Sequence, residues 1–165
     1  MPKKLDWIVS GWALLAGVLT LLIVLATTIN TAAFGADKIA RLFGANVAGL
    51  AGYEDFVRLT ISAVALMFFP YCQRRKGHVA VDLFADHFSV QIQQILEKII
   101  LVLTILLALF LAYWMSLGMI SAYQDFASSP ILGWPNWPFY LPGILSLVLW
   151  ALVAAMQLRE KRTSE

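Results

Sequence analysis

Acidic and basic side chains gather at two places in an otherwise apolar chain. The first is the stretch YEDFVR, which carries Glu54, Asp55 and Arg58 at the head of an uncharged run. Glu54 precedes Arg58 by four residues, so on a helix the two share a face and can form an ion pair. Two interpretations stay open: a pair at the membrane interface, or a buried pair that contacts another helix. Asp55 points about 100° away, and we expect it only to complement the helix start.

The second place is a group of histidines and aspartates that are close in sequence: His78, Asp82, Asp86 and His87. Such residues bind metal ions or transfer protons. A zinc site needs a third convergent ligand, however, and the spacing is not that of an H-E-x-x-H motif. The two aspartates are equally explained as the solvated face of a helix. A small membrane enzyme that uses this cluster is therefore kept as an alternative function.

Composition sets the class of protein. Hydrophobic residues make up 61% of the 165 residues and charged residues 13%, and the mean hydropathy is +0.78. These values are typical of integral membrane proteins. The net charge of +2 is small and its basic residues are scattered, which excludes a nucleic-acid-binding surface. The chain has no G-x-S-x-G motif, no P-loop and no histidine within an apolar span, so we expect no cofactor.

We predict an all-α integral membrane fold with four transmembrane helices in a single domain over residues 1–165. A helix needs about 20 residues to cross roughly 30 Å of hydrocarbon. The predicted spans are residues 7–29, 53–72, 99–123 and 139–158. The second span has a short uncharged stretch, so its first turns come from the charged YEDFVR segment.

An amphipathic helix is predicted between the second and third spans, over residues 79–94. Its apolar residues recur at steps of three and four, and polar residues fall on the other side. This pattern is typical of a helix that lies in the membrane interface. Because the polar face is acidic and rich in amides, we expect it to contact a protein neighbour, while the preceding RRK meets lipid head groups.

Lysine and arginine positions predict the orientation. Basic residues accompany the N-terminus, the segment after the second span and the C-terminus, whereas the opposite side has only Lys38 and Arg41. Positive charge accumulates in cytoplasmic loops, so both termini are expected in the cytoplasm. The outer segment 125–143 is rich in proline and tryptophan, which precludes a regular helix and suits the membrane interface.

Three sequence blocks resemble one transporter family. They are YEDFVR, then RRKGHVAVD with its Gly-His-x-x-x-Asp pattern, and then SSPILGWPNWPFYLPG before the last span. Together with the four-span layout, they resemble the small membrane subunit (Q subunit) of tripartite ATP-independent periplasmic (TRAP) transporters. Pro70, at the end of the second span, departs from the small or aliphatic residues expected there and puts the local helix geometry in question.

The resemblance implies a secondary, ion-coupled transporter of the bacterial inner membrane, with sodium as the expected ion. A periplasmic binding protein would deliver an organic acid to a large membrane subunit, which holds the transport sites. The small subunit would be a scaffold that binds no substrate. An accessory subunit of another membrane complex is a further alternative.

The resemblance also assigns expected roles to residues. A structural or subunit-interface role is expected of five residues: Glu54, Arg58, Gly77, His78 and Asp82. Contact with the binding protein is expected of three residues in the outer loops: Arg41, Trp134 and Trp137.

Overall fold

The computed structural model describes residues 3–75 and 90–163, and the regular elements of this part are all helical. The elements are α1 (Lys3–Arg41), α2 (Tyr53–Met67), α3 (Phe69–Arg74), α5 (Val90–Gln124), the 3-10 helix η1 (Trp137–Phe139) and α6 (Tyr140–Thr163). An isolated β-bridge joins Ser128 and Pro135 in the last loop. The all-α class is therefore confirmed.

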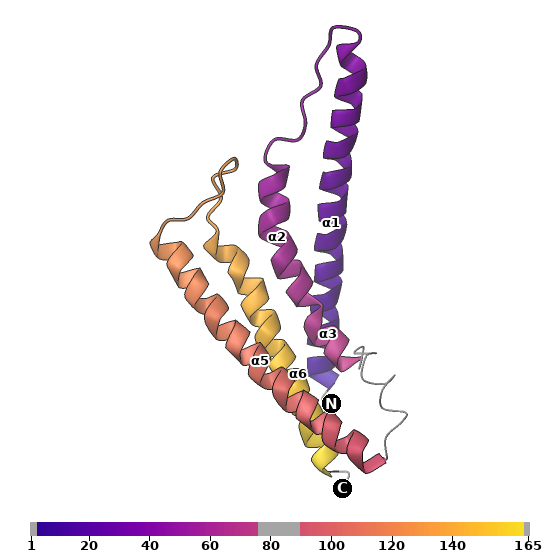
Figure 1. Ribbon diagram of the computed structural model, residues 1–165, viewed down its shortest axis with the longest axis vertical. Coiled ribbons are helices and arrows are strands. Elements are labelled where there is room, and N and C mark those ends of the chain that lie inside the picture. The colour runs from indigo at the N-terminus through magenta and orange to yellow at the C-terminus, as the bar shows by residue number, and fades with distance from the viewer. Residues whose placement is uncertain (1–2, 76–89, 164–165) are drawn as a thin grey trace.

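Four of these helical segments are long and apolar enough to cross a membrane within the described part of the chain. They are Lys4–Arg41, Tyr53–Arg74, Gln91–Gln124 and Trp137–Glu160, and each contains or closely matches one predicted span. The helices alternate in direction, so the two ends of the chain lie at the same end of the molecule (Figure 1). We call this the inner end and the opposite one the outer end.

The predicted interfacial helix lies mostly outside the described residues. Gly77, His78 and Asp82 fall in the same interval, so the structure leaves their roles as predictions. Residues 90–94, expected to end that helix, form the first turns of α5 instead.

Helix α1 extends well beyond the first predicted span. Its 39 residues measure about 58 Å at 1.5 Å per residue, against roughly 30 Å of hydrocarbon. Residues 30–41, which lie beyond the predicted span 7–29, continue α1 to the outer side. This segment contains no proline, and an ion pair of 2.8 Å between Asp37 and Arg41 spans its last turn.

A break divides the second span at Phe68. Pro70 lies in the first turn of α3, where its missing N–H costs no helical bond. The same ring would clash in a continuous helix, so α2 ends at Met67 and α3 begins at Phe69. The unusual geometry expected at Pro70 is therefore a helix break.

The helices form a row in which α5 packs on α6, α6 packs on α2 and α3, and α2 packs on α1 (Figure 1). Two clusters of buried residues fill the contacts: Ala108, Ala112, Leu147, Trp150 and Ala151 between α5 and α6, and Ala16, Ile23, Val64 and Met67 between α1 and α2. Small residues in these contacts let helix backbones approach closely.

Candidate functional site

Asp55 is the charged residue of α2 that points into the protein. Its side chain is 3% exposed, and its Oδ2 atom accepts hydrogen bonds from the backbone N–H groups of Ile131 (2.8 Å) and Leu132 (3.0 Å). Charge-assisted hydrogen bonds to backbone N–H groups are stronger than neutral ones. The first turn of α2 therefore holds the outer loop that precedes α6.

The outer loop has the compact shape that this contact requires. The Ser129 N–H donates to the carbonyl oxygen of Trp134 (2.8 Å), and the Trp134 N–H donates to the Ser129 hydroxyl oxygen (3.1 Å). Gly52, just before α2, has φ of +79°, and a Cβ atom there would lie 2.4 Å from Leu132. Glycine is thus required at position 52 both by its backbone conformation and by the close approach of Leu132.

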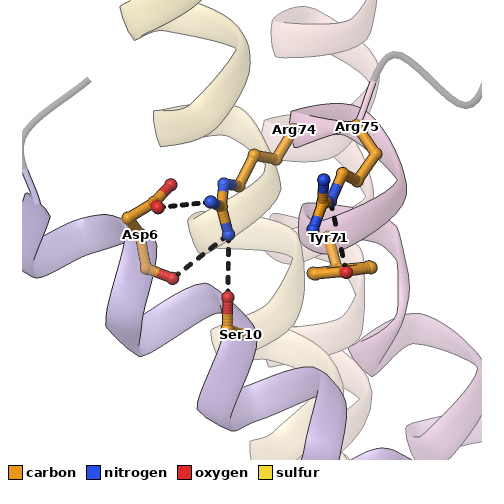
Figure 2. A network of polar contacts seen from close by, with 5 residues as sticks. All are labelled: Asp6, Ser10, Tyr71, Arg74 and Arg75. Carbon is orange, nitrogen blue, oxygen red and sulfur yellow. Dashed lines mark hydrogen bonds and ion pairs between the residues drawn. The ribbon is translucent and has the colours of Figure 1, made fainter.

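Arg74 joins α3 to α1 at the inner end (Figure 2). Its guanidinium forms an ion pair with the Asp6 carboxylate, and its Nη1 atom donates to the Ser10 hydroxyl at 2.7 Å. The neighbouring Arg75 instead contacts its own helix, where its Nε atom donates to the Tyr71 hydroxyl at 3.2 Å. The two adjacent arginines therefore differ in role, since Arg74 alone of the pair links two helices.

Gln73 joins α3 to α6 by side-chain hydrogen bonds in a buried position. Its Oε1 atom accepts from the indole N–H of Trp150 (3.1 Å), and its Nε2 atom donates to Gln157 Oε1 (2.9 Å). Gln157 in turn donates to the Gln73 carbonyl oxygen at 2.9 Å. Hydrogen bonds between membrane helices contribute about 0.6 kcal/mol each on average, so this set favours one fixed register of α3 against α6.

Helix α1 also contacts α6 through a polar pair in the apolar interior. The Trp12 indole N–H donates to the hydroxyl of the fully buried Ser146 at 2.8 Å. The Ser146 hydroxyl in turn donates a hydrogen bond to the Pro142 carbonyl oxygen at 2.6 Å. Trp12 and Ser146 thus bond to each other inside the row, whereas the buried Thr60 hydroxyl has no hydrogen-bond partner among the described residues.

Comparison with known protein families identifies the chain. The family model for the DctQ component of tripartite ATP-independent periplasmic transporters matches residues 31–163. The chain belongs to the DctQ family. Searches among curated proteins and among solved structures gave no match.

Membership confirms the family expected from YEDFVR and RRKGHVAVD. The chain is the small component of a TRAP transporter, and DctQ is a family of transporter components, not of enzymes. Four spanning helices together with this family fit a multi-pass protein of the inner membrane.

Glu54 and Arg58 of this DctQ chain are both exposed on α2. Within the described residues no ion pair joins them, in contrast to the pairing that their spacing predicts. The inward-facing acid is Asp55, which was expected only to complement the helix start. The loop that folds over Asp55 is distant in sequence, so the local pattern carried no sign of it.

The outer residues expected to contact the binding protein differ in exposure. Arg41 is exposed and paired with Asp37. Trp134 is 42% exposed, and its ring stacks on Phe139 at 6.2 Å. Trp137 is partly buried and packs edge-on against Tyr123 at 5.8 Å. Trp134 is therefore the more accessible tryptophan.

Asp6, Gln73 and Arg74 were not singled out by their sequence context, although one signal was available. Asp6 precedes the first span and Arg74 follows the second, so antiparallel helices bring them to the same side.

The part of the chain that the structure describes contains no group of three or more potential metal ligands. The alternative cluster of His78, Asp82, Asp86 and His87 lies outside that part.

Proposed function

We propose that this DctQ chain is a scaffold that packs beside the large membrane subunit and binds no substrate. The transporter would be a secondary one that couples import of an organic acid to an ion gradient, with sodium as the expected ion. A periplasmic binding protein would deliver the acid. The proposal rests on one observation. Asp55, Gln73 and Ser146, which are polar residues of the membrane-spanning helices, form hydrogen bonds within the chain.

The two end helices of the row supply the docking surfaces. Leu21 on α1 is 69% exposed and Leu106 on α5 is 60% exposed, and both belong to long apolar faces. Such faces must be covered by lipid or by another membrane helix. A row with two open apolar sides widens the membrane footprint of whatever packs on it, and this is the use that a stationary scaffold would have.

The orientation proposed here places the inner end in the cytoplasm. Helix α3, which ends at Arg74 and is followed by Arg75, lies at this end together with both chain termini, in keeping with the positive-inside rule (Figure 1). The loop held by Asp55 then faces the periplasm. Its accessible Trp134, together with Trp137 and with Arg41 from the end of α1, is the proposed contact for the binding protein.

The remaining predicted residues keep structural or interface roles in this proposal. Glu54 and Arg58 would face a neighbour outside the chain, since both are exposed on α2. Gly77, His78 and Asp82 would shape the connection toward α5.

Co-purification tests the proposed assembly. The chain is expressed with a tagged large subunit and binding protein, and we expect it to remain with the large subunit through detergent extraction and size-exclusion chromatography. If α1 docks on the large subunit, Leu21→Arg should release the chain from it. If α5 docks, Leu106→Arg should do so. Recovery of the chain free of the large subunit in every detergent would contradict a scaffold role.

A further inference from the structure

An open recess of about 350 Å³ lies between α2, α5 and the start of α6, near the outer end. Arg58 and Ser62 line it from α2, and Asn136 and Tyr140 line it from the segment that leads into α6. Met115 and Phe139 add an apolar wall. The recess thus combines a cation and two hydroxyl groups with hydrocarbon-like surface.

The polar side chains that line the recess make no hydrogen bond or ion pair in the part of the chain that the structure describes, although the charge of Arg58 acts on the Asp55 carboxylate. Arg58 is exposed and makes no hydrogen bond or ion pair there, and the same holds for the hydroxyls of Ser62 and Tyr140. A guanidinium within a membrane span is costly unless something compensates its charge. The Asp55 carboxylate offsets part of this charge, and the guanidinium N–H groups of Arg58 remain available to an anion from outside the chain.

The depth of Arg58 indicates the source of that anion. It lies five residues after the start of α2 at Tyr53, which is about 7 Å along the helix axis. This is the depth at which head groups meet hydrocarbon and at which arginine side chains reach for phosphates. An apolar wall beside the cation suits the glycerol and first acyl carbons of a lipid better than a free ion.

Asn136 supplies an independent observation. Its side-chain Oδ1 atom is buried and has no hydrogen-bond partner. A buried acceptor without a donor is unfavourable by about 1–3 kcal/mol, so rotation of the Asn136 side chain toward a ligand N–H or O–H group in the recess would be favourable. Ethanolamine and glycerol head groups carry such donors, whereas choline has none.

We propose that this recess is a specific site for one phospholipid. The phosphodiester binds Arg58, Ser62 and Tyr140, the head-group donor faces Asn136, and the acyl chains follow the apolar wall. The bound lipid would then be a fixed part of the α2–α5–α6 surface. The site does not depend on the scaffold role proposed above, but it gives Arg58 a lipid partner in place of a contact with the large subunit.

Native mass spectrometry of the full-length chain in detergent tests the site. We titrate phosphatidylglycerol, phosphatidylcholine and diacylglycerol with identical acyl chains, each in a separate series. We expect one phosphatidylglycerol to bind with an affinity at least about tenfold above that of diacylglycerol, because a charge-assisted phosphate contact is lost in the latter. Phosphatidylcholine should bind between the two.

Matched variants separate this site from general lipid adhesion. Arg58→Gln should lower the affinity for phosphatidylglycerol about tenfold and abolish the difference from diacylglycerol, and Ser62→Ala should have a smaller effect. Arg41→Gln is the control, since Arg41 is also an exposed outer arginine but is already paired with Asp37. An unchanged thermal unfolding temperature of each variant without added lipid would exclude misfolding as the cause of weaker binding.

Three results would overturn the proposal. One is equal binding of phosphatidylglycerol to Arg58→Gln and to the parent. Another is competition by inorganic phosphate at millimolar concentration, which would assign the recess to a free anion. The last is loss of the lipid on assembly with the large subunit, which would assign Arg58 to a protein carboxylate.

Discussion

At the scale of single residues, neighbouring acids on one helix turn have different uses. Glu54 is exposed, whereas Asp55 is buried and accepts two backbone hydrogen bonds from the outer loop. A helix rotates by about 100° per residue, so adjacent side chains face different surroundings. Which of the two acids is buried therefore depends on the side of α2 that the outer loop covers.

Replacing Asp55 should loosen the outer loop. In an Asp55→Ala variant, the N–H groups of Ile131 and Leu132 lose their acceptor, and we expect their hydrogen exchange to accelerate at least about tenfold. Glu54→Ala is the control and should leave these two amides unchanged. Equal acceleration in both variants would show that the loop depends on total charge and not on the Asp55 contact.

Sequence patterns at this scale singled out the YEDFVR segment and predicted an ion pair between Glu54 and Arg58, which the described residues do not form. They did not predict that Asp55 is the anchoring residue, because its partners are more than 70 positions away. The Asp6 and Arg74 contact was missed for the same reason. Long-range polar contacts become visible only when the packing of the helices is known.

At the scale of helices, hydropathy located the spans but not the true helix ends. Residues 30–41 of α1 are too polar to count as a span, yet nothing in them stops a helix. Pro70 carried a local signal because its ring excludes a continuous helix whatever the surroundings, and the break falls beside it. The outer end of α1, which no helix-breaking residue marks, is therefore harder to predict from sequence than the break beside Pro70.

The contact of Arg74 with Asp6 should couple α1 to α3. A double-mutant cycle with Asp6→Ala and Arg74→Ala is expected to give a coupling energy of about 0.2–1 kcal/mol, because both side chains are partly exposed to solvent. The coupling should fall at high salt. The measurement is unfolding of the purified chain in detergent with increasing denaturant.

Arg75 provides the control for this cycle. It contacts Tyr71 on its own helix, so Asp6→Ala combined with Arg75→Ala should be additive. A coupling energy for Arg75 as large as that for Arg74 would contradict a specific link between α1 and α3.

At the scale of the whole molecule, four helices in a row leave two broad apolar sides, and the described polar groups within the spans mostly serve internal packing. The exception is the recess at Arg58, which opens outward. Neither arrangement resembles a substrate pathway, which needs polar or ionisable groups facing a common cavity near the membrane midplane. The family identifies the transporter to which the chain belongs, and a supporting role within that transporter is our proposal.

The most direct test of this account is uptake of a labelled organic acid by liposomes under an inward sodium gradient. Four preparations are compared: this chain alone, the large subunit alone, the two membrane subunits together, and both with the binding protein. The account predicts uptake above empty liposomes only in the complete preparation, with none from this chain alone. Sodium-driven accumulation by liposomes that contain only this chain would contradict it.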